Sequence, residues 1–356
     1  MTAPHISCPM LQSLHVLDLI VLIGLLAGMV GVGVYLSLTQ RDSEDYFLAG
    51  RSLRWWTVAG SVFGTNVNAS HFIGMLGIGY SVGFAQSHYE VLALPAILVL
   101  CFVFLPLFRR LRVFTLSEFL EHRFGGGSRL VYTVLMITLI VVQLIAAFYI
   151  GSRTLVVLTA GTGYAVSYLQ GLLLIGLLCC SYTLYGGLRA VAVTDTLQTG
   201  IMLAAGVIVA WFTFTQVEIG GLDGLLSLER ALPEEVRRMR LYLPADHPDL
   251  PWPGVFTGLL VLQGFYWMTN QYLVQRTLAA VSDREAQIGV LAAGILKLAI
   301  PFLCVAAGVA AFHLFQARMP DRTILPDDAF LHLVDTVVPA GFGLRGLILA
   351  GILAAT

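Results

Sequence analysis

The chain has 356 residues, of which 58% are hydrophobic and only 12% are charged, and its net charge is -1 at pH 7. A soluble domain carries about 25% charged residues, so this composition argues against a soluble enzyme and against a disordered chain. The balanced charge also lacks the basic surface that a nucleic-acid partner requires.

Long apolar blocks follow one another along most of the sequence. They occupy residues 14–38, 55–80, 89–108, 130–158, 165–185, 190–215, 255–278 and 288–314. A membrane-spanning helix needs about 20 apolar residues, so the pattern predicts an all-α, polytopic protein whose partner is the lipid bilayer. A further block begins near 342 and is still apolar at Thr356, so we expect the sequence to stop inside a helix.

The arginines are distributed unevenly between the two sides of the predicted spans. With the N-terminus outside, the inward-facing loops hold the arginines in 41–54, in 109–129, at 189 and in 276–284. Inner loops are typically rich in Lys and Arg, so we expect an outside N-terminus. The expected location is the plasma membrane, the inner membrane of a bacterium. Thr115–Arg123 has a capping pattern and is predicted to lie along the inner surface. The polar segment 221–252 is predicted to be an external loop with a short helix over Pro233–Leu241.

The second span carries small and polar residues at membrane depth. Gly64, Asn66, Asn68 and His71 all fall within the segment Ser61–His71. Irregular backbone is tolerated in the bilayer only where it is buried or lines a cavity, and the freed carbonyls of broken transporter helices bind cations. We therefore expect a broken helix. The alternative, a helix packed closely through small residues, accounts for Gly64 but not for the amides and the histidine.

Two ionisable residues lie in or beside later spans. Lys297 is the only lysine in the chain and lies in the middle of the block 288–314. A lysine at the centre of a membrane helix costs roughly 2.5–3.5 kcal/mol, so it should point at a carboxylate or a ligand oxygen. A purely structural ion pair is the alternative. Glu90, at the start of the third span, either faces a polar cavity or extends to water at the boundary.

The seventh span combines aromatic rings with amides. Gln263, Tyr266, Trp267 and Asn270 have the spacing of one helical face. Rings and amides together suit a polyol, whereas an aromatic stripe alone would indicate packing. Asp195, at the inner end of the sixth span, either caps a helix or pairs with an arginine, or else it lies on a cation exit path.

Four segments of the chain carry a recognisable pattern: Asp45–Trp56, Phe72–Tyr80, Tyr185–Val191 followed by Thr194 and Asp195, and Asn270–Thr277. They resemble the sodium/solute symporter family, with particular likeness to its sodium/glucose and bacterial sodium/galactose cotransporters. The resemblance implies a LeuT-type fold in one transmembrane domain, residues 1–356, with an extra N-terminal helix at 14–38. A first five-helix repeat would occupy 55–215, and an inverted, incomplete second repeat would occupy 255–356.

The same resemblance implies which residues hold each transported partner. For the solute, a sugar or polyol, they are Asn66, His71, Met75, Tyr89, Glu90, Gln263, Tyr266 and Lys297. For Na+, they are the backbone carbonyls of Gly64, Val67 and Ala355, with Asp195 as a candidate cation exit. The oligomeric state does not follow from these residues.

The function implied is sodium-coupled import of a sugar or polyol, of the glucose, galactose or inositol type, by alternating access. Two alternatives stay open: a sodium symporter for an amino acid or carboxylate, and a symporter-like membrane module of a sensor protein. No nucleophile–base pair or metal-binding cysteine spacing occurs in the sequence, so we do not expect an enzyme.

Overall fold

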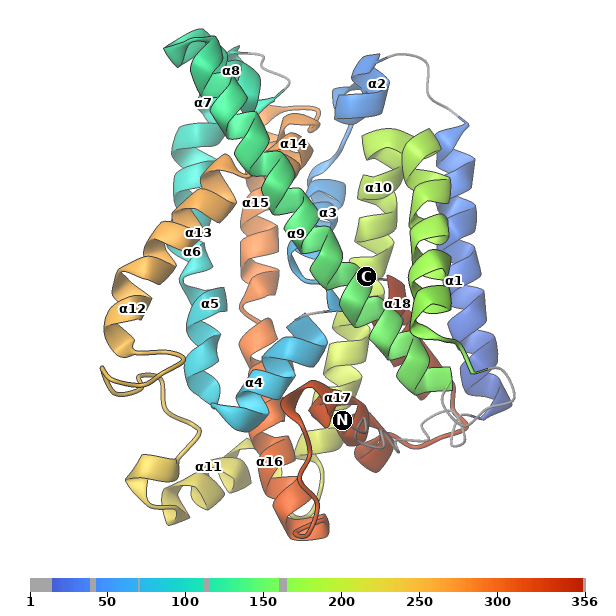
Figure 1. Cartoon of the computed structure of the whole chain (residues 1–356), viewed down its shortest axis with the longest axis vertical. Helices are drawn as coiled ribbons and strands as arrows, with labels where there is room; N and C mark the ends of the chain where they lie inside the picture. The colour runs from blue at the N-terminus through green and yellow to red at the C-terminus, as the bar shows by residue number, and fades with distance from the viewer. Residues whose placement is uncertain (1–14, 39–42, 70, 112–114, 160–164, 355–356) are drawn as a thin grey trace.

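The described part of the chain is helical. A computed structural model describes residues 15–38, 43–69, 71–111, 115–159 and 165–354. Within these ranges the chain forms helices and two isolated β-bridges, Leu53 with Ala280 and Leu243 with Pro251 (Figure 1). The predicted all-α fold class is confirmed.

Short helical elements alternate with long ones along the chain. Up to residue 214 they are α1 (Val16–Ser37), α2 (Ser43–Leu48), η2 (Ala49–Arg51), α3 (Trp55–Asn66), η3 (His71–Met75), α4 (Leu76–Ser81), η4 (Phe84–Ser87), α5 (His88–Val91), α6 (Ala93–Val99), η5 (Leu100–Phe104), α7 (Leu105–Leu111), α8 (Leu116–Phe124), α9 (Gly126–Thr159) and α10 (Tyr168–Phe214). After it they are α11 (Gly221–Ala231), η6 (Glu234–Val236), α12 (Trp252–Phe256), α13 (Gly258–Thr269), α14 (Gln271–Leu278), α15 (Asp283–Lys297), η7 (Pro301–Ala306), α16 (Ala307–Arg318), α17 (Pro326–Val337) and α18 (Leu344–Ala354).

Five helical stretches of the described chain are long and apolar enough to cross a membrane. They are Val16–Ser37, Phe84–Leu111, Gly126–Val156, Gly186–Phe214 and Asp283–Arg318. Each corresponds to a predicted span. The predicted spans 165–185 and 190–215 meet inside α10 at Gly187, where φ 50° and ψ −164° interrupt the helical backbone. Glycine adopts a positive φ at little steric cost, which permits the turn between the two helices.

The predicted span 55–80 is a discontinuous helix. α3 ends at Asn66, Val67 is extended with φ −92° and ψ 105°, and the π-helical element η3 begins at His71. The broken helix predicted from the polar stretch is therefore confirmed. Ser70, one of the polar residues of that stretch, lies outside the described residues.

The predicted span 255–278 is also discontinuous, which the sequence analysis did not anticipate. Asn270, with φ −80° and ψ 121°, separates α13 from α14. Its side chain accepts the N–H of Tyr272 at 3.4 Å and so caps α14. The prediction that Asn270 continues the helical face of Gln263 and Tyr266 is wrong, because asparagine stabilises a helix start better than a helix interior.

The external loop has a different helix from the predicted one. The helix lies at Gly221–Ala231, and the segment Pro233–Leu241 contains only the short turn η6. The Glu229 carboxylate accepts the N–H groups of Arg238 and Met239, at 2.6 and 2.9 Å. These two N–H groups are therefore not available for the backbone hydrogen bonds of a helix over 233–241.

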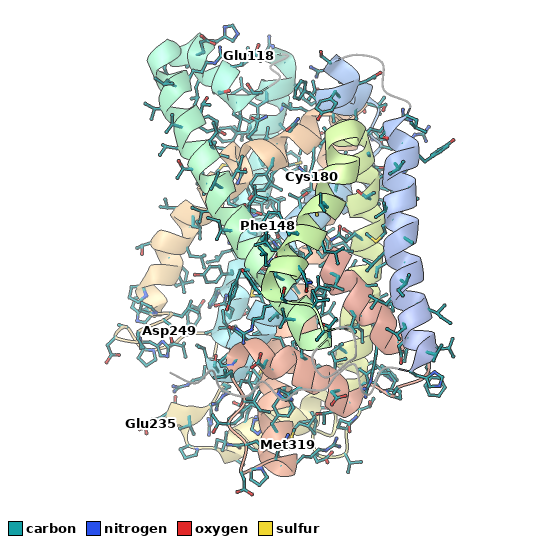
Figure 2. The ribbon with its side chains drawn as sticks, turned by 45° about the vertical axis from the view of Figure 1, so that its right-hand side comes forward. Glu118, Phe148, Cys180, Glu235, Asp249 and Met319 are labelled. Atoms are coloured by element: carbon teal, nitrogen blue, oxygen red, sulfur yellow. The ribbon has the colours of Figure 1, made fainter. Side chains whose placement is uncertain are left out.

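The helices run between two opposite ends of the molecule. In Figure 1, α2, α7, α8 and α14 gather at one end, whereas α11, α16 and α17 lie at the other. Figure 2 places Glu118 of α8 at the first end and both Glu235 and Met319 at the second. The loops predicted to face inside and those predicted to face outside are therefore on opposite sides.

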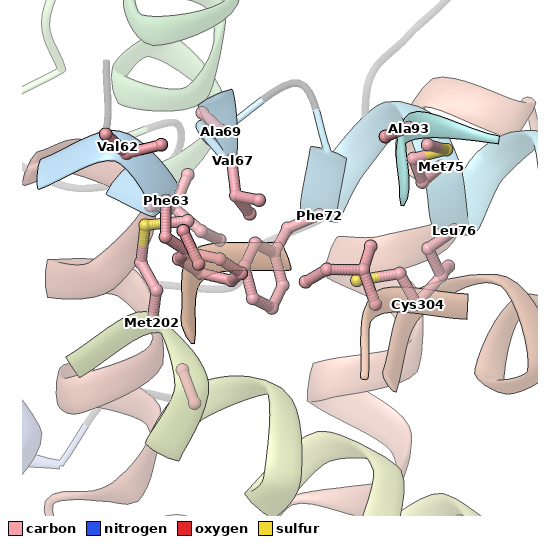
Figure 3. Close-up of a cluster of buried hydrophobic side chains, with 14 of the residues drawn as sticks. Val62, Phe63, Val67, Ala69, Phe72, Met75, Leu76, Ala93, Met202 and Cys304 are labelled. Atoms are coloured by element: carbon pink, nitrogen blue, oxygen red, sulfur yellow. The ribbon is translucent and has the colours of Figure 1, made fainter. Parts of the chain in front are cut away.

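An apolar cluster surrounds the break in the first discontinuous helix. Val67 and Phe72, from the two sides of the break, are buried with Phe63 and Met202 in this cluster, as Figure 3 shows. The break thus has an apolar face that packs against α10. Its polar side chains lie on the opposite face.

Candidate functional site

A polar cavity of about 270 Å³ lies beside the first break. Its walls come from α3, η3, α5, α9, α13, α14 and α15. It is lined by Thr65, Asn66, Asn68, His71, Met75, Tyr89, Glu90, Gln143, Leu262, Gln263, Tyr266, Tyr272 and Lys297. All eight residues predicted to hold the solute are in this lining, although they come from sequence positions up to 231 residues apart.

Lys297 forms the charged centre of the cavity. Its Nζ lies 2.5 Å from Glu90 Oε2 and donates to Asn66 Oδ1 at 2.5 Å. All three residues are buried, with Lys297 3% exposed and Glu90 1% exposed. The two charges compensate each other, so Lys297 has the carboxylate partner that its membrane depth predicted. The indole ring of Trp267 lies 5.6 Å from the ammonium and adds a weak cation–π contact.

His71 extends the polar lining from the other side of the break. Its Nε2 is 3.7 Å from Glu90 Oε1, and its Nδ1 is 3.3 Å from Asn68 Oδ1. The imidazole therefore bridges the carboxylate on α5 and the amide at the break. These groups offer both donors and acceptors to a hydroxylated ligand.

The amide and aromatic side chains of α13 complete one wall. The Asn66 amide donates to Tyr266 Oη at 2.9 Å, which joins the first discontinuous helix to the second. Gln263 Nε2 donates to the Tyr89 carbonyl at 2.7 Å, and the Trp267 indole donates to Gln263 Oε1 at 3.0 Å. These bonds fix the orientations of the Gln263 amide and of the Tyr266 ring, whose face is suited to packing on a sugar.

Five lining residues were not among the predicted solute residues. They are Thr65, Asn68, Gln143, Leu262 and Tyr272. Thr65 and Asn68 belong to the polar stretch of the second span, and Gln143 is a lone amide in an apolar block, so polarity at membrane depth was an available signal. Tyr272 carried no such signal, because its position depends on the break at Asn270.

The backbone at the break frees the two carbonyls predicted for sodium. In a continuous helix the N–H of Asn68 would bond to the Gly64 carbonyl, and that of His71 to the Val67 carbonyl. Here the Asn68 N–H donates to His71 Nδ1 at 3.3 Å, and the His71 N–H donates to the Asn68 carbonyl at 2.9 Å. Both oxygens thus lose their helical donors. The third predicted ligand, Ala355, lies outside the described residues.

Asp195, the candidate cation exit, is paired with an arginine. Its Oδ2 lies 3.1 Å from Arg276 Nη2 and accepts bonds from Ser61 and Thr65. Pairing with an arginine was one of the two interpretations of this residue, and it is the one that the structure contains. A role in cation exit stays a prediction.

Comparison with known proteins connects this arrangement to a family. Residues 46–356 match the profile of the sodium:solute symporter family. The chain is 35% identical to the sodium/glucose cotransporter of Vibrio parahaemolyticus over 85% of this chain and 56% of that protein. It is 32% identical to sodium/glucose cotransporter 1 of Oryctolagus cuniculus, over 99% of this chain and 56% of that protein. It is 35% identical to sodium/myo-inositol cotransporter 2 of Mus musculus, over 97% of this chain and 54% of that protein.

A solved structure gives the same fold. A substrate-bound, outward-open Na+-coupled sialic acid symporter matches 96% of this chain and 71% of its own, with a TM-score of 0.81 and 24% identity. The predicted LeuT-like fold is confirmed by this likeness. The chain spans about half the length of the sodium/glucose and sodium/myo-inositol cotransporters that it matches.

Proposed function

The chain belongs to the sodium:solute symporter family, and from this premise we propose that it serves the sodium-coupled import of a neutral polyhydroxyl solute, a sugar or an inositol. The family is one of membrane transporters, not of enzymes. The proposal covers the activity of the whole protein, its sodium ion and its solute, because the chain spans only about half of the relatives named above.

The observation that carries the proposal is the compensated charge inside the cavity. Lys297 and Glu90 neutralise each other at 2.5 Å, and Asn66 and His71 contact them. A neutral solute can exchange hydroxyls for some of these contacts without leaving an uncompensated buried charge, which would be expensive. Tyr266 adds a ring face. The eight predicted residues are proposed as the solute site.

We place the sodium ion at the first break. The carbonyl oxygens of Gly64 and Val67 have lost their helical donors, and a hard cation prefers several oxygen ligands. Gly64 also approaches α10 closely, since a Cβ there would lie 2.8 Å from Thr199 Oγ1. A side chain at this position would separate α3 from α10 and displace the carbonyl.

The proposed architecture follows the inverted-repeat scheme. The two discontinuous helices, α3 with η3 and α13 with α14, would open the repeats at 55–215 and 255–356, with α1 as the extra helix. The arginine-rich end with α8 would face the cytoplasm of a bacterium, and the N-terminus would lie outside. Solute and cation would then meet near the middle of the membrane, where repeats of this kind form their sites.

Uptake by purified protein in proteoliposomes tests the proposal. We expect an imposed sodium gradient, but not an equal potassium gradient, to drive uptake of glucose, galactose or myo-inositol. The variant Glu90→Gln with Lys297→Met keeps the cavity neutral and removes its charged pair, so it serves as the inactive control. Uptake restricted to an amino acid or to an acidic sugar such as sialic acid would contradict the neutral solute. Uptake without sodium dependence would contradict the coupling.

A further inference from the structure

A charged cluster lies beside the cavity, on its arginine-rich side, and joins three helices. Asp195 of α10 accepts bonds from three residues on its Oδ2: Ser61 at 2.8 Å and Thr65 at 3.2 Å from α3, and Arg276 of α14 through Nη2 at 3.1 Å and Nε at 3.4 Å. Arg276 Nε also donates to Ser61 Oγ at 2.8 Å. The side chains of Arg276 and Asp195 are only 11% and 15% exposed.

The cluster is continuous with the cavity lining. Arg276 Nη1 donates to the carbonyl of Tyr272, whose side chain lines the cavity, and Thr65 lines the cavity as well. The rings of Tyr272 and Tyr266 meet edge to face at 6.1 Å. The charged cluster therefore contacts two residues that line the cavity, Thr65 and Tyr272, from the arginine-rich side.

Backbone hydrogen bonds connect a residue just before α3 with the residues that follow α14. Leu53, just before α3, donates to Ala279 at 3.1 Å and accepts from Val281 at 2.9 Å. The Glu285 carboxylate accepts the first N–H of α3, that of Trp55, at 2.6 Å. α3, α14 and the start of α15 thus form one connected unit.

This unit is attached to α10 through side chains. Thr196 and Thr199 of α10 donate to carbonyls of α3, at 3.3 and 2.7 Å, and Asp195 makes the charged contacts described above. Side-chain contacts of this kind can separate while α3, α10 and α14 each keep their own helical hydrogen bonds.

We propose that Arg276 and Asp195 form a latch that holds α3 and α14 against α10, and that breaking it opens the cavity toward the arginine-rich side. The inference rests on the proposed transport function, because opening toward each side in turn is what transport requires. Arg276 acts here as a positioning residue, since it contacts the backbone of a lining residue and not the cavity itself.

A cysteine introduced in place of Tyr272 reports the opening. Tyr272→Cys is placed in a background with Cys179→Ser and Cys180→Ser, and the background alone provides the blank. A membrane-impermeant thiol reagent is applied to vesicles from the arginine-rich side. We expect Arg276→Gln and Asp195→Asn each to raise the labelling rate of the introduced thiol about tenfold, which corresponds to about 1.4 kcal/mol in the closing equilibrium.

The labelling rate of the double variant shows whether Arg276 and Asp195 act on each other or independently. If the residues act only on each other, Asp195→Asn with Arg276→Gln labels no faster than either single variant. Arg284→Gln removes an equal charge from an exposed arginine at the same end and should leave the rate within about twofold. Ser61→Ala, a milder change that removes the hydroxyl touching both charged groups, should raise the rate about threefold and remain folded.

Unchanged labelling in Arg276→Gln, in Asp195→Asn and in Ser61→Ala would overturn the latch, as would an equal rise in Arg284→Gln. Additive effects in the double variant would overturn it as well. Sodium-driven uptake in the same vesicles keeps the two proposals apart. Labelling that follows the latch without any such uptake would contradict the transport function and leave the latch standing.

Discussion

The two discontinuous helices are broken in different ways. The first break lies between Asn66, where α3 ends, and His71, where η3 begins, whereas the second consists of the single residue Asn270 between α13 and α14. At the first break the polar side chains themselves reach the cavity. At the second, Asn270 is fully buried and caps α14, and the cavity residues are its neighbours Tyr266 and Tyr272.

The difference shows two ways in which an interrupted membrane helix can build a site. At the first break, the carbonyls of Gly64 and Val67 lose their helical donors, and Asn66 at the end of α3 contacts Lys297 and Tyr266. At the second, interruption redirects the chain so that two tyrosines from separate helices meet at 6.1 Å. We therefore expect substitutions at the first break and its partners to change binding, and substitution of the second break to change mainly stability.

The largest loss of solute affinity should come from the substitution of Lys297, whose ammonium contacts Asn66 at the first break. Lys297→Ala leaves Glu90 buried without its partner, and removing one member of a buried pair costs about 3–5 kcal/mol. Equilibrium binding to purified protein should show at least about a hundredfold loss of solute affinity. The double variant Glu90→Gln with Lys297→Met is the control, because it should regain thermal stability without regaining affinity. Unchanged affinity in Lys297→Ala would make the residue purely structural.

A smaller loss is expected at the carboxylate of the same pair. Glu90→Gln removes the charge that faces Lys297 and His71 but keeps the size of the side chain and an amide oxygen. Lys297 thus retains neutral acceptors, this oxygen and Asn66 Oδ1, whereas Lys297→Ala leaves the carboxylate without any cation. Hydrogen bonds to charged groups contribute about 1.5–3 kcal/mol, so the solute dissociation constant should rise roughly tenfold to a hundredfold. A variant that binds the solute as tightly as the parent protein would show that the Glu90 carboxylate does not contribute to solute binding.

The continuous spans and the first break were predictable from the sequence for physical reasons. Apolar length alone marks helices such as α1 and α9, because nothing but the bilayer requires so many apolar residues in succession. The first break is visible because several polar residues at one depth have no explanation within an intact helix. The only lysine was likewise predicted to face a carboxylate or a ligand oxygen, because an unpaired charge at membrane depth is costly, and Glu90 is its partner.

The second break and its consequences were not predictable in this way. One asparagine in an apolar span fits a helical face as well as a cap, and only the backbone of Asn270 distinguishes the two. The same holds for the external loop, where the position of Glu229 decides against the helix expected at 233–241. That the eight lining residues bind a solute stays a prediction, although the structure brings them together around one cavity.

The second break should respond as a helix cap. Asn270→Ala removes the oxygen that accepts the Tyr272 N–H, and losing such a cap typically costs about 1 kcal/mol of stability. We expect a lower thermal midpoint in detergent with solute affinity changed by less than about threefold. Asn270→Ser keeps a capping oxygen and should remain close to the parent in both measurements. An affinity loss as large as that of Glu90→Gln would erase the distinction between the two breaks.

The outer half of the first discontinuous helix is held by an ionisable contact. Arg238 Nε donates to the carbonyl of Tyr80 in α4 at 3.0 Å, and the Glu229 carboxylate fixes the backbone of Arg238 and accepts from His313 Nε2 at 2.6 Å. Burial opposes ionisation of Glu229, but the hydrogen bonds from His313, Met239 and Arg238 outweigh it and hold the pKa of this carboxyl below its usual value.

A lowered glutamate pKa stabilises the folded loop at neutral pH and stops doing so in acid. The contribution is complete above the ordinary glutamate pKa of about 4.3 and is lost as the pH falls through the lower folded-state pKa. Hydrogen exchange at the Arg238 and Met239 amides, corrected for its intrinsic pH dependence, should therefore become faster by about threefold to tenfold between about pH 6 and pH 3, since one hydrogen bond contributes about 0.5–1.5 kcal/mol. Glu229→Gln should lose this acid response, whereas Glu234→Gln, at a carboxyl in the same loop that is 76% exposed, should keep it. A flat exchange profile in the parent protein would show that ionisation of Glu229 does not hold this loop against the first discontinuous helix.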